Sequence, residues 1–108
     1  GSEANNTILK GVAEAYQGKG RHIITSMIEH PSIMATCKYL ETSGFEVTYL
    51  PVNGLGQVEA AQVQRALTQE TILVSIMHSN NETGTLQPIK AIADICKKEN
   101  IFSDISNF

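Results

Sequence analysis

The chain carries two clusters of hydrogen-bonding side chains, and each follows an apolar run that is typical of a buried strand. Residues 78–84 (HSNNETG) follow the run 71–77, and His30 comes shortly after the run 22–26. In an open α/β sheet, ligands bind at the carboxyl ends of the strands. An imidazole there can stack on an aromatic ligand or move protons, and the amide of Asn81 can donate to a ligand oxygen. The two clusters therefore predict one binding site at one edge of a sheet.

The same residues also have structural interpretations, and the sequence leaves both open. His30 can cap the helix that follows it, and Glu82 can hold the polar loop together through local hydrogen bonds. Ser2 opens a predicted helix. Free N–H groups and the helix dipole at such a start bind phosphate, but serine is also a common N-cap. His22 begins a strand at the opposite edge and is interpreted as structural.

Hydrophobic spacing divides the chain into alternating helices and strands. Helices are predicted at 3–17, from 31 to a stop at Gly44, at 58–67 and at 88–98; strands are predicted at 21–26, 45–50, 71–77 and from about 101. Tyr16 belongs to the apolar spacing of the first helix. Helices that alternate with strands imply right-handed crossovers. The expected fold class is therefore α/β, with a mainly parallel sheet and helices on both faces.

The composition favours a single globular domain and argues against several classes of protein. The chain has 108 residues, 42% of them hydrophobic, and a net charge of -3 with the signs interspersed. It has no basic stripe, no apolar run long enough to span a bilayer and no charged-then-apolar leader. We therefore expect no nucleic-acid or membrane partner and a cytoplasmic or organellar location. Cys37 and Cys96 are expected to be reduced thiols packed in the core. Both chain ends are interpreted as cut from a longer protein.

Several catalytic and nucleotide-binding motifs do not occur in the sequence. There is no Gly-x-Gly-x-x-Gly fingerprint, no P-loop, no nucleophile elbow and no His-Glu-x-x-His pair. These motifs position phosphates, nucleophiles or zinc in the folds that use them. A generic nucleotide-binding α/β domain is therefore disfavoured.

The chain resembles the cysteine desulfurases, which are fold-type I pyridoxal-phosphate enzymes of the class V aminotransferase group. The segments that carry the resemblance are 1–6, 22–26 with 29–30, 44–50 and 71–84, and the last is the most specific. The resemblance implies that residues 1–108 form part of the large, cofactor-binding domain, with no second domain present. The complete enzyme would convert L-cysteine to L-alanine and leave sulfur as a protein persulfide for iron–sulfur cluster or thio-cofactor assembly. A selenocysteine lyase or another class V relative is the alternative within this chemistry.

The resemblance implies roles toward pyridoxal 5'-phosphate. Ser2 matches the phosphate-loop residue, His30 the catalytic histidine that stacks on the pyridine ring and helps proton transfer, and Asn81 the asparagine that bonds the phenolic oxygen. The family also pairs an aspartate with the pyridinium nitrogen, so that the ring acts as an electron sink. Ungapped counting from Asn81 puts Ser106 at that position, and Asp104 lies two residues earlier. Either a two-residue deletion lets Asp104 take the role, since a shift by two keeps the facing of a strand, or the tail is degenerate.

Other parts of the family's machinery do not occur in this chain. The Ser-x-His-Lys-type motif of the cofactor lysine and the mobile cysteine loop are both missing. We therefore expect no turnover from the isolated chain. For the full enzyme, the resemblance implies L-cysteine as substrate, a sulfur-acceptor protein as partner and a homodimer. A non-catalytic truncated remnant is the alternative from a different class of function.

Overall fold

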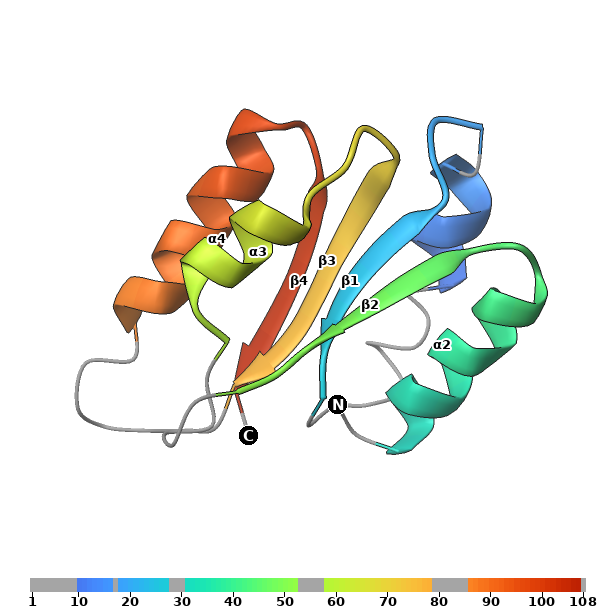
Figure 1. Ribbon diagram of the computed structural model, residues 1–108, viewed down its shortest axis with the longest axis horizontal. Coiled ribbons are helices and arrows are strands. Elements are labelled where there is room, and N and C mark those ends of the chain that lie inside the picture. The colour runs from blue at the N-terminus through green and yellow to red at the C-terminus, as the bar shows by residue number, and fades with distance from the viewer. Residues whose placement is uncertain (1–9, 17, 28–30, 53–57, 79–85, 108) are drawn as a thin grey trace.

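One four-stranded parallel sheet organises the chain, as the computed structural model in Figure 1 shows. The structure describes residues 10–16, 18–27, 31–52, 58–78 and 86–107, with the backbone alone at 31–32, 77–78, 86–89 and 104–107. The strands are β1 (His22–Ser26), β2 (Glu46–Leu50), β3 (Thr71–His78) and β4 (Phe102–Asn107), in the spatial order β2-β1-β3-β4. The helices are α2 (Pro31–Thr42), α3 (Ala60–Ala66) and α4 (Leu86–Lys98), and residues 10–16 are also helical.

Helices cover both faces of the sheet. Helices α3 and α4 pack on one face, and α2 with residues 10–16 packs on the other (Figure 1). Alternate residues of a strand point to opposite faces. Ile23 and Leu73 accordingly join the core beneath α2, whereas Ile24 and Val74 join the core beneath α3 and α4. The expected α/β class, with a parallel sheet and helices on both faces, is confirmed.

The two cysteines lie one in each core. Cys37 on α2 and Cys96 on α4 are both 0% exposed, and neither is in a disulfide. A free cysteine behaves as a small buried hydrophobe in such places. The predicted placement of both thiols in the core is confirmed.

Helix α2 ends in a hydrogen-bonded turn that depends on glycine. The N–H of Gly44 donates to the carbonyl oxygen of Glu41, and the N–H of Phe45 donates to that of Leu40 over 3.0 Å. Gly44 has a φ of 97°, in the left-handed region that side chains disfavour. Asn100, with a φ of 59°, stands at the equivalent position after α4. The predicted stop at Gly44 is confirmed.

Helices α3 and α4 begin at other residues than the pattern predicts. Helix α3 begins at Ala60 rather than 58, because Gln62 Oε1 accepts the backbone N–H of Glu59 at 3.0 Å and so caps the helix there. Helix α4 begins at Leu86, two residues before Pro88, because proline is tolerated in a first turn whose N–H groups have no helical partner. Within the described ranges, none of the helices has the length and apolar character needed to cross a membrane.

Tyr16, which belongs to the apolar spacing of the first helix, makes an apolar contact but is not buried. Its side chain is 37% exposed, and its ring packs against the ring of Phe102 with centroids 4.9 Å apart. Phe102 lies on the edge strand β4 and is itself 46% exposed. The last turn of this helix therefore lies over the rim of the sheet, where the aromatic pair is only partly covered.

Candidate functional site

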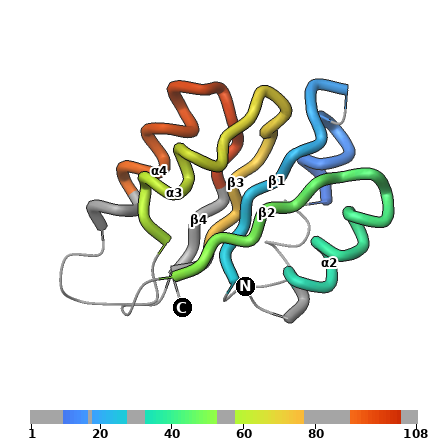
Figure 2. The backbone as a smooth tube through the Cα atoms, in the orientation of Figure 1, coloured from blue at the N-terminus to red at the C-terminus, as the bar shows by residue number. Residues whose placement is uncertain are grey.

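Strands β1 and β3 run side by side (Figure 2) and are parallel, so their carboxyl ends lie at one edge of the sheet, which we call the carboxyl edge. Strand β1 ends at Ser26, four residues before His30, and β3 ends at His78, three residues before Asn81. His30, Asn81 and Ser2 themselves lie outside the described residues. The structure thus places the framework of the predicted site: two neighbouring parallel strands whose connections both leave from the edge where α/β sheets bind ligands.

A row of polar positions crosses three strands at the level of Thr25, the residue before the last of β1. Thr25 pairs with Ser75, and Ser75 pairs with Asp104, in parallel register. Paired residues share a face of the sheet, which here is the face covered by α2 and residues 10–16. Thr25 is 0% exposed and Ser75 is 2% exposed. Two hydroxyls are therefore buried in an otherwise apolar layer.

The hydroxyl oxygen of Thr25 is the unusual atom of this row. It is buried, and it has no hydrogen-bond partner among the described residues. Leaving a buried hydroxyl unpaired costs roughly 1–3 kcal/mol, so nearly all such groups in folded proteins are paired. Thr25 can therefore exchange a hydrogen bond with a polar group that a bound ligand brings to the carboxyl edge.

Strand β4 carries both residues that compete for the aspartate position of the family. Asp104 pairs with Ser75, and Ser106 pairs with Met77. Residues two apart on a strand share a face and are separated by roughly 7 Å along it. Asp104 is thus in line with the buried hydroxyls, and Ser106 lies one position nearer the carboxyl edge.

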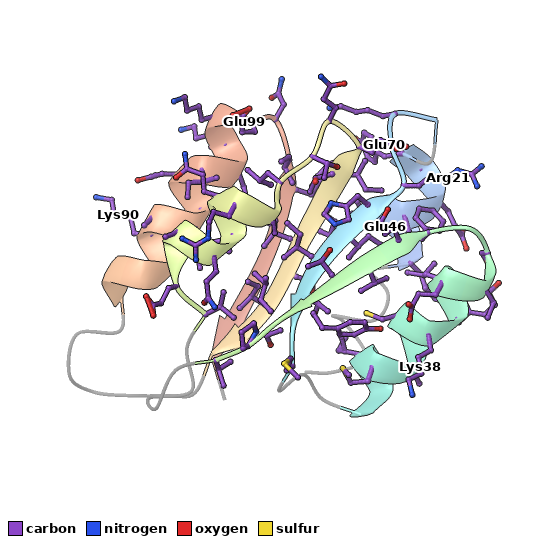
Figure 3. All side chains as sticks on the ribbon, viewed as in Figure 1. Arg21, Lys38, Glu46, Glu70, Lys90 and Glu99 are labelled. Carbon is purple, nitrogen blue, oxygen red and sulfur yellow. The ribbon has the colours of Figure 1, made fainter. Side chains whose placement is uncertain are left out.

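The described residues supply neither of the two reactive groups that desulfurase chemistry needs. Every lysine is exposed on a helix or turn, and Figure 3 shows Lys38 and Lys90 pointing away from the sheet. The full set is Lys10, Lys19, Lys38, Lys90, Lys97 and Lys98. Burial raises the pKa of Cys96 to about 11, so its thiol stays protonated at neutral pH. Cys37 is fully buried as well.

A parallel α/β sheet with a polar carboxyl edge defines a broad class of ligand-binding domains, and comparison with known proteins defines the family. The model of the family "Aminotransferase class-V" matches residues 1–105, so the chain belongs to this family. Cysteine desulfurase IscS of Clostridium botulinum (strain Kyoto / Type A2) is 54% identical over 102 residues, which cover 94% of this chain and 26% of that relative. The chain thus spans about a quarter of the length of the curated relatives it matches. The resemblance to cysteine desulfurases inferred from the sequence is confirmed.

Solved structures agree with this assignment. The structure titled "SspA in complex with cysteine" matches with a TM-score of 0.83 at 41% identity, covering 96% of this chain and 30% of that chain. A mutant of C-DES, whose title describes glycine covalently linked to the PLP cofactor, matches with a TM-score of 0.55 at 28% identity, covering 83% of this chain and 24% of that one. The fold is therefore that of pyridoxal-phosphate-dependent relatives.

The residues described here fit such a cofactor in part. Thr25 has an unpaired hydroxyl just inside the carboxyl edge. A polar cofactor ring bound there, or a residue that binds the ring, could form a hydrogen bond with this hydroxyl. The strands that form this edge carry no lysine, so these residues fit non-covalent contacts and not the covalent link.

The sequence pattern does not identify Thr25 and Ser75 as a pair of buried hydroxyls. Each is a small polar residue inside an apolar strand, one position before the end of β1 and midway along β3. Their shared feature, an in-register pairing across two strands, depends on a contact between residues far apart in the chain. The available signal was a hydroxyl inside each of two apolar runs that both lead to the predicted site.

Proposed function

We propose that this chain is part of the large, cofactor-binding domain of a pyridoxal-phosphate-dependent cysteine desulfurase. The whole enzyme would convert L-cysteine to L-alanine and pass the sulfur, as an enzyme-bound persulfide, to an acceptor protein for iron–sulfur cluster or thio-cofactor assembly. The observation that carries the proposal is the adjacency of β1 and β3, whose parallel carboxyl ends lead to His30 and Asn81. The 54% identity to an IscS desulfurase supports this reaction over others of the family.

Ser2, His30 and Asn81 each contact the cofactor in this proposal. Ser2 binds the phosphate together with backbone N–H groups of the helix start expected there. His30 stacks its imidazole on the pyridine ring and carries a proton to or from the reacting substrate carbon. Asn81 donates an amide hydrogen to the phenolic oxygen. Bound pyridoxal phosphate supplies an electron sink for the charge that develops at that carbon.

The buried hydroxyl row supports this site from within the sheet. Thr25 lies next to the last residue of β1, and its free hydroxyl can bond to the bound group or to a residue that holds it. Ile23 and Leu73 belong to the apolar core on the same face. These apolar side chains exclude water beneath the site and so strengthen each hydrogen bond made there.

We assign the contact with the ring nitrogen to Asp104, the carboxylate that β4 carries in line with the hydroxyl row. Asp104→Asn should then weaken cofactor binding by roughly tenfold or more, since a hydrogen bond to a charged group contributes about 1.5–3 kcal/mol. Ser106→Asp is the matched variant on the same face and should change little. Tighter binding by Ser106→Asp, with no effect of Asp104→Asn, would move the contact to position 106.

The isolated chain is proposed to bind the cofactor without turning over cysteine. The lysine and the nucleophilic thiolate would come from the rest of the protein, acting as a homodimer in the cytoplasm or an organellar matrix, where thiols stay reduced. Incubation of the chain with pyridoxal phosphate and L-cysteine should release no alanine. Alanine release would contradict this part of the proposal.

A non-catalytic truncated remnant is the second candidate, and the exposure of every lysine favours it for the chain on its own. A selenocysteine lyase is a third hypothesis, with the same cofactor site as the desulfurase. Comparison of cysteine with selenocysteine as substrate of the complete enzyme separates the lyase from the desulfurase.

Titration with pyridoxine 5'-phosphate separates the cofactor-binding domain from an inert remnant. This analogue has no aldehyde, so it cannot attach covalently to the exposed lysines. Calorimetry or phosphorus NMR should show saturable binding that pyridoxine without its phosphate does not reach, because the phosphate site contributes much of the affinity. A remnant without a site would show no saturation with either compound.

A further inference from the structure

We propose that His22 is the centre of a proton-sensitive latch that joins β1, β2 and β3 at the amino edge of the sheet, opposite the carboxyl edge. In its neutral form the imidazole holds Thr48 of β2 and Thr71 of β3 at the same time. Protonation removes one hydrogen-bond acceptor from this group and loosens the edge. The latch rests on residues remote from the cofactor site and does not depend on the function proposed above.

The geometry of His22 defines the latch. The residue begins β1 and is 3% exposed. Its Nδ1 atom lies 2.6 Å from Oγ1 of Thr71, and its Nε2 atom lies 2.7 Å from Oγ1 of Thr48. A neutral imidazole has one N–H and one bare nitrogen, so it donates to one threonine and accepts from the other. The bond to Thr71 is buried and the bond to Thr48 is partly buried, so leaving the first unmade is the more costly.

The surroundings of Thr71 indicate what an added proton would disturb. Its Oγ1 atom accepts the backbone N–H of Thr68 at 2.9 Å, and the Oγ1 atom of Thr68 lies 3.4 Å away. In a charged imidazole both nitrogens donate and neither accepts. One threonine hydroxyl then loses its acceptor on His22. The other hydroxyl within reach of Thr71 is that of Thr68, at 3.4 Å. The charged imidazole therefore leaves this group with poorer hydrogen bonds than the neutral imidazole does.

The latch lies where the backbone pairing of β1 and β3 is irregular. His22 pairs with Thr71, but the next pair is Ile23 with Leu73, so Ile72 is an extra residue on β3. Such a bulge interrupts the ladder of backbone hydrogen bonds. The side chain of His22 therefore adds a link to β3 beside the backbone hydrogen bond that the N–H of His22 donates to the carbonyl oxygen of Glu70 over 3.0 Å.

Charged groups from the neighbouring elements face the latch. Among the described residues, Arg21 before β1, Glu46 on β2 and Glu70 before β3 line one cavity of about 430 Å³ together with His22. Figure 3 labels these three charged side chains, which come from three neighbouring segments of the sheet. Burial lowers the pKa of His22 below its usual 6.5, and the carboxylates of Glu46 and Glu70 oppose this in part. The cavity gives solvent protons a path to the imidazole. The latch therefore responds to the pH of the surrounding solution.

Amide hydrogen exchange, measured by NMR alongside the titration of His22, tests the latch. As the pH falls through the mildly acidic range, the opening equilibrium of the Ile23, Val47 and Leu73 amides should rise by up to about tenfold per pH unit, after correction for intrinsic exchange. The rise should begin near pH 6.5 and level off below the pKa that the His22 ring signals report for the folded chain. His22→Gln stays neutral over this range and should lose the dependence.

Two results would overturn the latch. One is an amino edge whose protection stays constant while the ring of His22 titrates in the unmodified chain, a measurement that does not depend on the folding of any variant. The other is an equal pH dependence of protection in the unmodified chain and in a folded His22→Gln variant.

Discussion

Thr25 on β1 and Ser75 on β3 form one register pair, and both side chains are buried on the face of the sheet that α2 covers. The hydroxyl of Thr25 has no partner among the described residues. Such a group lowers stability unless another group satisfies it. We infer that the two hydroxyls line the bottom of the cofactor site. The unpaired hydroxyl lowers the stability of the ligand-free chain but can form a hydrogen bond when the cofactor binds.

Thr25→Val tests whether this hydroxyl is unpaired in the ligand-free chain. Valine has nearly the same shape, so the variant should keep its stability or gain up to about 1 kcal/mol. Thr71→Val is the matched control, because Thr71 is also buried but bonds to His22 and to the N–H of Thr68. The control should lose about 1–3 kcal/mol in urea unfolding. An equal loss at both positions would mean that Thr25 has a partner in the folded chain.

Gly20→Ala should destabilise the chain because the backbone of Glu70 leaves no room for a side chain. A Cβ atom at Gly20 would clash with the carbonyl oxygen of Glu70, so one of the two segments must move. Overpacking of this kind costs about 1–3 kcal/mol. Gly11→Ala is the control, since a Cβ there meets nothing within 4 Å and alanine favours the helix by about 0.5–1 kcal/mol.

The two substitutions should move the midpoint of thermal or urea unfolding in opposite directions. A Gly20→Ala variant as stable as the unmodified chain would mean that the approach of Glu70 to residue 20 is not tight in solution.

Gly44 and Gly20 show which structural roles of a glycine can be predicted from the sequence pattern and which cannot. Gly44 was predicted as a helix stop, because a helix end needs a left-handed residue and the signal is local. The contact of Gly20 with Glu70 joins residues far apart in the chain, so the residues around position 20 do not predict it. The exposure of Tyr16 is not predictable for a related reason: helical spacing gives the face of a helix, but not where the sheet beneath it ends.

The free energy of unfolding should depend on pH through His22. Burial lowers the pKa of His22 below 6.5, so between the two values the unfolded chain binds a proton that the folded chain does not. Stability from neutral His22 is therefore complete above pH 6.5 and is lost as the pH falls toward the folded pKa. Urea unfolding over a pH series should show this decline in the unmodified chain and a shallower one in His22→Gln. Identical slopes would assign the decline to other groups.

Neither cysteine should react with an alkylating reagent in the folded chain. The pKa of Cys96 is about 11, and both thiols are fully buried. The nucleophilic thiolate is therefore scarce and shielded at mildly alkaline pH. Mass spectrometry should find Cys37 and Cys96 unlabelled by iodoacetamide in native buffer and labelled in guanidinium chloride. Rapid native labelling of either one would reopen it as a sulfur carrier.

The candidate site was predictable in outline because its location follows from topology. Parallel strands that each end in polar residues must present them at one edge, and β1 and β3 prove to be neighbours. The role of His22 was predicted only as structural; its bonds to Thr48 and Thr71 join residues 26 and 49 positions away in the chain. Such pairings depend on strand register and on a bulge, which hydrophobic pattern does not encode.

The central claim is that His30 and Asn81 hold pyridoxal phosphate at the carboxyl edge. Its most direct test is a binding titration of the folded chain with pyridoxine 5'-phosphate, repeated for His30→Ala, Asn81→Ala and the exposed control Lys38→Ala. We expect saturable binding that the control retains and that each site variant weakens by roughly tenfold, as for the loss of one good hydrogen bond or stacking contact. Binding that is absent in the unmodified chain, or unchanged in both site variants, would contradict the account.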